Sequence, residues 1–388
     1  MIAAIYPNIT HPDSKGRPVR YFDIRKLTEG ECLRLMDVSE PDIRTLVDSP
    51  LLSKSAIYKL AGNSIVVSCL YHIFRNIWLT EPKVEPMSLF PEPTFRADIP
   101  STFHIVTLFS GYDSQLMAMQ RIADEANRTT QGGQKHTVNL AAWAEFDPES
   151  KRPLEQQPAV IAHNLLFPQY KGRNLGDVTK VDWQKVKDEM VPQLADIDLL
   201  TYSSPCQSIS NAGKRAGIAK GSGTRSATLW YVEEAIRVLR PKFLLQENVK
   251  ALCNKVNRPH FEEWQQVCQA LGYTNYWAVL NAKDYGVPQN RERVFMLSVR
   301  NDLNLPTYRF PEPIPLTKVV ADELQEDVSK DYFLRPEGVI KFLQRNSADQ
   351  GDGIIYTITD HFLTDEEIIH LRNNPPSDQD SGSQANPT

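Results

Sequence analysis

Short apolar runs alternate with helix-spaced apolar positions through the middle of the chain. Four such runs, each followed by a loop and a helical pattern, predict buried strands at 104–109, 138–146, 198–202 and 243–245. Before the stop signal Pro241, apolar residues recur every three or four positions and predict an amphipathic helix: Leu229, Val232, Ile236 and Leu239. Strands that alternate with helices indicate an α/β fold, with a parallel sheet covered by helices on both faces.

The pattern changes on either side of this region. After Gly272 two further strands are expected at 276–280 and 294–299, joined by a loop that carries Arg291 and Arg293. A helix is expected at 65–77. Five prolines between residues 81 and 100 indicate an extended linker, and the polar tail from Asn374 is typical of disorder.

Size and composition narrow the class of protein. The 388 residues suit one large domain and a smaller one, and 41% apolar residues suffice for a core. The sequence has no apolar run near 18 residues and no signal-peptide pattern at Met1, so we expect a cytoplasmic protein with no membrane partner. Five cysteines without CxxC or Cys/His spacing predict neither a metal site nor a disulfide framework.

Charge is unevenly distributed along the chain. The net charge is −5, but residues 201–300 hold 14 Lys and Arg against 7 Asp and Glu. Residues 311–388 hold 6 against 15. Affinity for nucleic acid depends on a basic face near the chemistry rather than on the chain total, so the middle third is the part expected to meet a polyanion.

Polar residues with chemical potential follow the predicted strands, where α/β sheets bind their ligands. Three fragments stand out, about 40 residues apart: Ser203–Ser208 with Cys206, Gln246–Val249 with Glu247, and Gln289–Arg293 with Arg291 and Arg293. A thiolate can add to a pyrimidine ring, a carboxyl can stabilise the altered ring nitrogen, and an arginine can hold the exocyclic oxygen. The fragments therefore predict an enzyme that activates a pyrimidine.

In order, spacing and local context these fragments resemble the DNA cytosine-5 methyltransferases of bacteria and phages. The resemblance implies a Rossmann-like sheet that binds S-adenosyl-L-methionine, no metal, and double-stranded DNA as substrate, with the target cytosine flipped out of the helix. Cys206 would attack the ring, Glu247 would contact N3 and the amino group, Arg293 would hold O2, and Arg291 would steady the loop near Cys206. The two arginines could exchange these roles.

The resemblance also implies a site for the methyl donor. Glu145 would bind the ribose hydroxyls, Phe146 would lie against adenine, and Asp177 would read the adenine amino group. The other residues expected around the donor are Phe109, Ser110 and Gly111 at a helix N-terminus, with Val178, Pro205, Leu229, Asn63 and Ser64. Where the family usually has a second glycine, this chain has Asp113, which we expect to cap the helix starting at Gln115.

Two blocks near the N-terminus, Arg25–Met36 and Ala61–Val67, look like the last two blocks of the same family, which most members carry at the C-terminus. The chain therefore resembles a circularly permuted member. The expected parts are the permuted final blocks at 20–80, the linker at 81–100, the catalytic core at 101–310, a short target-recognition region at 311–373 that could include 1–20, and the tail at 374–388.

Alternatives remain at this level. The glycine-rich basic segment after Gln207 resembles a loop that closes over a flipped base, but it also suits an ordinary surface loop. The short acidic recognition region leaves open a separate specificity partner, and a cognate restriction enzyme is a possible partner. A tRNA cytosine-5 methyltransferase on the same scaffold and a catalytically silent DNA-binding paralogue are the competing functions.

Overall fold

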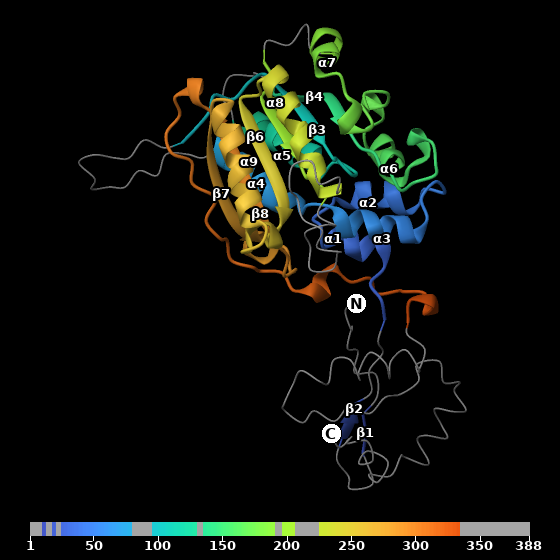
Figure 1. Ribbon diagram of the computed structural model, residues 1–388. Helices are drawn as coiled ribbons and strands as arrows, with labels where there is room; N and C mark the ends of the chain where they lie inside the picture. The colour runs from blue at the N-terminus through green and yellow to red at the C-terminus, as the bar shows by residue number, and fades with distance from the viewer. Residues whose placement is uncertain are drawn as a thin grey trace, which may run out of the picture. The chain divides into compact units, whose positions relative to one another are not determined.

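A computed structural model of the chain describes residues 10–12, 18–20, 25–79, 95–129, 135–190, 196–205 and 225–333 (Figure 1). By its contacts the chain divides into a large unit, Cys32–Val320, and a small unit made of Met1–Glu31 and Ala321–Thr388. Cys206, the segment 207–224 and most of the expected recognition region lie outside the described residues.

The large unit is built on a six-stranded sheet with the order β4-β3-β5-β6-β8-β7. The strands are β3 (Thr102–Leu108), β4 (Thr137–Ala144), β5 (Leu199–Tyr202), β6 (Phe243–Val249), β7 (Tyr273–Asn281) and β8 (Glu292–Arg300). The first four are parallel, and β8 lies antiparallel between β6 and β7. The expected α/β fold is confirmed, with a terminal hairpin that makes the sheet mixed.

Helices cover both faces of this sheet. The described helices are α1 (Glu29–Arg34), α2 (Glu40–Val47), α3 (Lys54–Asn63), α4 (Val67–Trp78), α5 (Ser114–Thr129), α6 (Pro158–Leu166), α7 (Trp183–Met190), α8 (Val232–Leu239) and α9 (Arg258–Ala270). Side chains of α4 and α5 share one core cluster with Leu245, and those of α8 and α9 share another with Leu244. Neighbouring residues of β6 therefore face opposite layers, as the pleat of a strand requires.

Short 3-10 helices complete the connections between these elements. They are η1 (Leu154–Gln156), η2 (Pro168–Tyr170), η3 (Val178–Lys180), η4 (Arg225–Tyr231), η5 (Lys250–Cys253), η6 (Ala282–Tyr285), η7 (Asn301–Leu303), η8 (Val320–Glu323) and η9 (Lys330–Tyr332). The helix expected at 229–239 is in fact divided, since η4 precedes α8 and Leu229 lies in η4. None of the helices that the structure describes is long and apolar enough to cross a bilayer.

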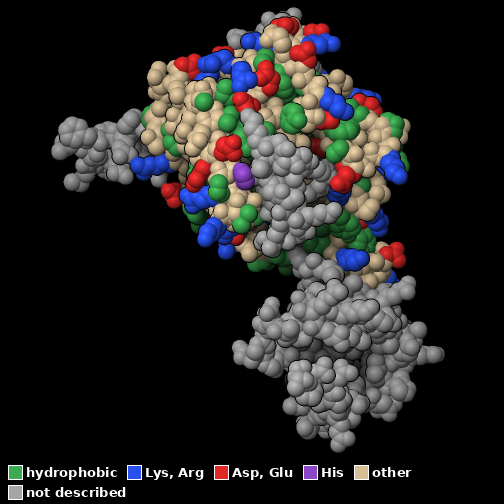
Figure 2. Space-filling model, in the orientation of Figure 1, with side chains coloured by type: hydrophobic (Ala, Val, Ile, Leu, Met, Phe, Trp, Pro, Cys, Tyr) green, Lys and Arg blue, Asp and Glu red, His purple; other side chains and the backbone are tan. Residues whose placement is uncertain are grey.

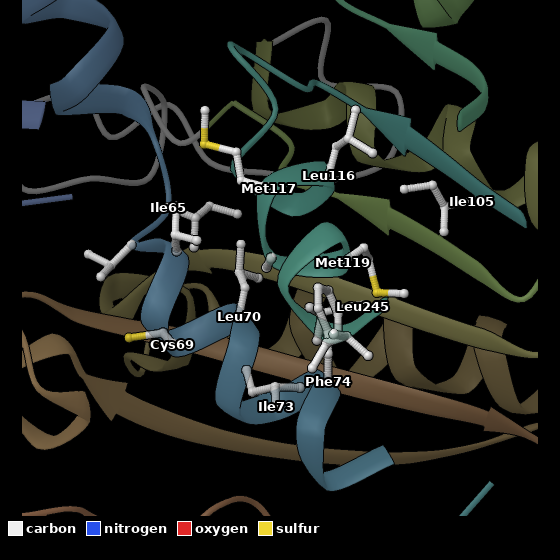
Figure 3. Packing of buried hydrophobic residues seen from close by; sticks show 14 of the residues in the cluster. Ile65, Cys69, Leu70, Ile73, Phe74, Ile105, Leu116, Met117, Met119 and Leu245 are labelled. Carbon is white, nitrogen blue, oxygen red and sulfur yellow. The ribbon is translucent and has the colours of Figure 1, made fainter. Parts of the chain in front are cut away.

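Helix α4 joins the N-terminal segment to the core. Figure 3 shows Leu70 and Phe74 beside Met119 of α5 and Leu245 of β6. The Trp78 ring lies edge-on to Phe103 at 5.1 Å and to Phe243 at 5.5 Å between ring centroids. The helix expected at 65–77 is therefore confirmed almost to its bounds. It packs on one face of the sheet and belongs to the core of the large unit.

Of the expected linker, the structure describes residues 95–100. Phe95 and Ala97 are both buried there, and the Ala97 amide donates to the Ile77 carbonyl at 2.8 Å. Phe95 also packs edge-on against Tyr308, with centroids 5.0 Å apart. The end of this segment is thus core structure rather than a spacer.

The small unit is centred on a buried ion pair. Both Nη atoms of Arg25 donate to the two carboxylate oxygens of Glu31, at 2.7 and 2.8 Å. Glu31 also accepts from the backbone amides of Thr28 and Gln325, and the Lys26 amide donates to the Tyr332 carbonyl. These contacts lower the pKa of Glu31 against the effect of its burial, which is the largest single influence and raises it. Two short strands, β1 (Thr10–Pro12) and β2 (Pro18–Arg20), pair antiparallel in the same unit.

Candidate active site

The loop between β3 and α5 (residues 109–113, the β3–α5 loop) has an unusual backbone. Phe109, Gly111 and Asp113 all have positive φ, at 56°, 59° and 70°. Left-handed backbone is disfavoured for residues with a Cβ, so the loop needs contacts that hold it. The Ser110 amide donates to the Ala144 carbonyl at 3.3 Å, and the Gly111 amide donates to Oε2 of Glu145 at 2.8 Å.

Glu145 directly follows β4, and its contact with Gly111 brings together the ends of two neighbouring strands. Its backbone is held by Asn174, whose Oδ1 accepts from the Glu145 amide at 3.1 Å and whose Nδ2 donates to its carbonyl at 3.2 Å. Phe146 follows and is half-buried. Asn174 is not predicted from the sequence, because an asparagine three residues before Asp177 matches no motif or spacing.

Asp177 lies at the start of η3 and caps it. Its Oδ1 accepts from the amide of Thr179 at 3.1 Å and from the Thr179 hydroxyl at 2.8 Å, while Val178 is buried. One carboxylate oxygen of Asp177 is therefore engaged locally, and an adenine amino group would have to meet the other. Its expected role stays a prediction.

The segment ahead of β3 that lies in the large unit (residues 32–79, the N-terminal block) reaches the same side of the sheet through Ser64. Ser64 is the C-cap of α3, and its hydroxyl lies 2.6 Å from the hydroxyl of Ser114, the first residue of α5. Asn63 beside it is exposed. Ser64 is thus adjacent to the first residue of α5, and its expected role at the donor stays a prediction.

Arg291 links the arginine loop to this corner. Its Nη2 donates to the carbonyls of Gly62 at 2.8 Å and Ser64 at 2.7 Å. Two residues earlier, Nε2 of Gln289 donates to the Leu35 carbonyl at 2.6 Å. The expected contact of Arg291 near Cys206 lies outside the described residues, and what the structure describes is an anchor to the N-terminal block. No local pattern could have revealed the role of Gln289, since its partner is far away in the sequence.

Glu247 and Arg293 form the second centre. Glu247 lies within β6, is 8% exposed, and has its Oε1 3.2 Å from Nε of Arg293 on the neighbouring strand β8. Burial raises the pKa of the Glu247 carboxyl, and the guanidinium groups of Arg293 and then Arg291 lower it; burial prevails. A carboxyl group that retains a proton beside a guanidinium can donate a hydrogen bond to a ring nitrogen while the arginine binds a neighbouring oxygen.

Strand β6 extends further than the apolar run predicted, to Val249 instead of Leu245. Gln246, Glu247 and Asn248 continue the ladder because β8 pairs with them. Polar residues in a buried strand interrupt the apolar pattern, so the pattern predicts a strand that is too short.

The chain that leads to Cys206 is held on both sides. Asn248 Nδ2 donates to the carbonyl of Ser204 at 3.1 Å, and the Ser226 hydroxyl donates to the Pro205 carbonyl at 2.6 Å. Asn248 thus fixes the end of β6 to this segment. Cys206 comes immediately after this held segment in the sequence. Leu229, expected near the donor, lies in η4 and is buried in a core cluster.

Three of the four described cysteines are poorly suited to nucleophilic chemistry. Cys69 and Cys268 are buried, and burial raises the pKa of each thiol to about 12. Cys253 is half-buried, and burial raises its pKa too. A thiol with a raised pKa forms little thiolate at neutral pH, so these residues pack or stay inert. Within the ranges described, no three His, Cys, Asp or Glu side chains are grouped so as to hold a metal ion.

The basic residues of 201–300 are partly committed to ion pairs. Lys250 pairs with Glu292 at 2.8 Å, Arg258 with Glu262 at 2.9 Å, and Arg237 pairs within its own helix. On the described part of the face in Figure 2, basic and acidic side chains are interspersed. The expected basic face stays a prediction, and Lys214, Arg215 and Lys220 lie outside the described residues.

Comparison with known proteins gives matches to DNA methyltransferases. A family model described as C-5 cytosine-specific DNA methylase matches residues 159–381. The type II methyltransferase M2.ScrFI of Lactococcus lactis subsp. cremoris is 42% identical over 163 residues, covering 42% of this chain and 42% of that protein. The orphan methyltransferase M.SssI of Spiroplasma monobiae is 37% identical over 180 residues, covering 45% and 42%. These matches span less than half the length of either relative.

Solved structures give weaker likenesses. S. pombe Dnmt2 methyltransferase aligns with a TM-score of 0.41 at 16% identity, covering 70% of this chain and 80% of that one. The Entamoeba histolytica methyltransferase EhMeth aligns with a TM-score of 0.40 at 15% identity, covering 62% and 65%.

Proposed function

The chain belongs to the C-5 cytosine-specific DNA methylase family, and on this premise we propose that it transfers a methyl group from S-adenosyl-L-methionine to C5 of a cytosine in double-stranded DNA. The observation that supports this most strongly is the Glu247–Arg293 pair, at 3.2 Å, beside the segment that Asn248 holds just before Cys206. A proton donor and a guanidinium so placed suit one pyrimidine ring, and Cys206 is the next residue in the sequence after the held segment.

Cys206 begins the reaction by adding its thiolate to C6 of the flipped ring. As the C–S bond forms, Glu247 gives its proton to N3, and the ring becomes an enamine that is nucleophilic at C5. Arg293 holds O2 and stabilises the electron density that gathers there. C5 takes the methyl group from the sulfonium, loses its proton to solvent, and expels Cys206 while N3 returns its proton to Glu247.

The donor supplies an electrophilic methyl group, and the residues at the β3 and β4 ends fit it. The N-terminus of α5 follows the β3–α5 loop and favours an anionic group such as the donor carboxylate. Glu145 already accepts from the Gly111 amide at 2.8 Å, so a ribose can be met by a carboxylate whose position is fixed. Phe146, Asp177, Val178 and Pro205 are proposed to complete this side.

A circular permutation of the family order is part of the proposal. It is supported by three contacts within the large unit: Ser64 to Ser114, Arg291 to the carbonyls of Gly62 and Ser64, and Gln289 to Leu35. Each joins the N-terminal block to elements that carry the proposed chemistry. The block would then belong to the catalytic domain instead of forming a separate module.

Replacing Cys206 tests the covalent step. We expect Cys206→Ala to abolish methyl transfer to duplex DNA while the dissociation constant of S-adenosyl-L-methionine changes little, because only the covalent step needs the thiolate. Cys253→Ala is the matched control and should retain the wild-type rate, since that thiol has a raised pKa.

A duplex containing 5-fluorocytosine provides the second measurement. Fluorine at C5 cannot leave as a proton does, so the wild-type enzyme should form a donor-dependent adduct that survives denaturing electrophoresis. Near wild-type turnover by Cys206→Ala, or no adduct, would remove the mechanism. Transfer to tRNA in place of duplex DNA would instead change the substrate class.

A further inference from the structure

The last residue of the β3–α5 loop is a fully buried carboxylate. Asp113 is 0% exposed and has a φ of 70°. Its Oδ1 accepts from the Leu116 amide at 3.0 Å, which caps α5 as the sequence predicted, although α5 begins at Ser114. Its Oδ2 accepts from the Thr107 hydroxyl at 2.7 Å. A buried carboxylate is costly unless all its contacts are favourable, so a residue of this kind needs a reason.

Asp113 meets an imidazole from a different element. His163 of α6 is 0% exposed, and its Nε2 lies 3.4 Å from Oδ2 of Asp113. The His163 ring is stacked on Trp143 at 3.6 Å between centroids, with an interplanar angle of 12°. Among the residues that the structure describes, neither ring nitrogen of His163 makes a hydrogen bond. The stacking on Trp143 thus holds the ring with its Nε2 atom 3.4 Å from the carboxylate, a polar contact rather than a hydrogen bond.

The carboxylate is in turn connected to the loop backbone. The Thr107 hydroxyl, which donates to Asp113, lies 3.0 Å from the hydroxyl of Ser110, and Ser110 also donates to the Thr107 carbonyl at 3.0 Å. The Thr107 hydroxyl therefore links the Asp113 carboxylate to the Ser110 hydroxyl, and the Asp113 amide donates directly to the Ser110 carbonyl at 2.8 Å. His163, Asp113 and Thr107 form a buried series that ends in the loop where positive φ angles are concentrated.

We propose that Asp113 is a positioning residue for S-adenosyl-L-methionine, and that His163 holds it in place by contact with its carboxylate. The Asp113–His163 pair fixes the left-handed geometry of residues 109–113, so that the amides there are preorganised for the donor. A glycine at this position would only permit the positive φ angle. The aspartate also fixes the loop, because its carboxylate binds Thr107 and the Leu116 amide. The inference rests on the proposed function, because it assumes that this loop binds the donor.

Two substitutions of His163 give the primary test. His163→Phe keeps the stacking on Trp143 but removes the ring nitrogen that contacts Asp113. We expect it to raise the dissociation constant of S-adenosyl-L-methionine about tenfold or more, the effect of losing one polar partner of a buried carboxylate. His163→Gln restores an N–H donor and should recover part of the loss. The dissociation constant of duplex DNA should stay unchanged in both variants.

A double-mutant cycle identifies the pair. In Asp113→Asn combined with His163→Phe, a neutral amide needs no charge partner, so donor affinity should be better than in His163→Phe alone. Asp113→Gly should weaken donor binding as well, because the cap and the Thr107 anchor are lost. Wild-type affinity in Asp113→Gly would show that only backbone freedom matters and would overturn the proposal.

Controls separate this inference from the proposed function and from a loss of folding. His104→Phe, a half-buried histidine at the other end of β3, should leave donor affinity unchanged. If His163→Phe lowers the unfolding temperature but binds the donor like the wild type, the pair is structural and the inference fails. If the wild-type protein itself does not bind S-adenosyl-L-methionine, the proposed function fails instead.

Discussion

At the scale of single residues, Glu247 combines a structural cost with a chemical use. Burial raises the pKa of its carboxyl more than Arg293 and Arg291 lower it. The folded protein therefore binds this proton more readily than the unfolded chain. The resulting stabilisation is complete below the ordinary pKa of a glutamate and is lost as the pH rises through the raised value.

Replacement of Glu247 should separate activity from stability. We expect Glu247→Gln to lower the turnover number by about 10²-fold or more, because glutamine cannot give a proton to N3. The unfolding temperature at pH 8 should not fall, because the substitution removes a carboxylate that the folded state disfavours there. Thermal scans from pH 4 to 8 and a methyl-transfer assay measure both effects.

The control for Glu247 lies on the neighbouring strand. Glu292→Gln removes an exposed carboxylate that pairs with Lys250 and should leave the turnover number near the wild-type value. An unchanged rate in Glu247→Gln together with a lower unfolding temperature at pH 8 would contradict both its assigned role and the sign of its pKa shift.

At the scale of elements, α4 holds the N-terminal block to the sheet by apolar packing. Eight of its side chains are buried, among them Trp78 at 1% exposure. Just before α4, the Ser64 hydroxyl contacts Ser114 at the start of α5, and Arg291 donates to the Ser64 carbonyl. Displacing α4 should therefore disturb both the core and the proposed donor side.

Trp78→Ala tests this packing. We expect a loss of about 3–5 kcal/mol in the free energy of unfolding, because a large buried side chain leaves a cavity between two sheet residues. Trp277→Ala is the matched control: Trp277 is 38% exposed on the edge strand β7, and its loss should cost clearly less. Urea denaturation measures both variants, and equal losses would mean that α4 is not a central packing element.

How much the sequence could predict differs from element to element. The apolar runs predicted β3, β4 and β5 because parallel buried strands are continuously apolar. The insertion of β8 between β6 and β7 could not be predicted, since strand order depends on contacts between distant segments.

The candidate site shows the same limit. Glu247 and Arg293 were identified through local motifs, and the structure places them in contact. His163 and Gln289 were missed because a single histidine or glutamine has no spacing that distinguishes it. Their importance arises only from partners that the fold brings to them.

At the scale of the whole molecule, the proposed chemistry lies in one unit, and most of the region expected to recognise the DNA sequence lies in the other. All the donor-side contacts described above lie within Cys32–Val320, whereas Arg25, Glu31 and Tyr332 lie in the other unit. The expected recognition region, 311–373, overlaps the boundary between the units, and its greater part lies outside the described residues.

A chain that ends at Phe333 should lose discrimination among DNA sequences but retain the donor. It keeps the contacts of Tyr332 with Lys26 and Glu29 and every donor-side contact, so we expect the dissociation constant of S-adenosyl-L-methionine to stay within about twofold. Methylation of a library of duplexes, compared with the full chain, measures discrimination. An equally large loss of donor affinity would show that residues 334–388 belong to the catalytic unit.

The position of Trp78 has a consequence for the synthesis of the protein. Helix α4 emerges from the ribosome before Phe243, one of the two aromatic partners of Trp78, which lies far later in the chain. At roughly 5–20 residues per second, an amphipathic helix with seven side chains of the hydrophobic core waits on the order of ten seconds for its partner strand. During that interval α4 is a natural target for chaperones and a starting point for aggregation, so slower growth or added chaperone should improve the soluble yield of this protein.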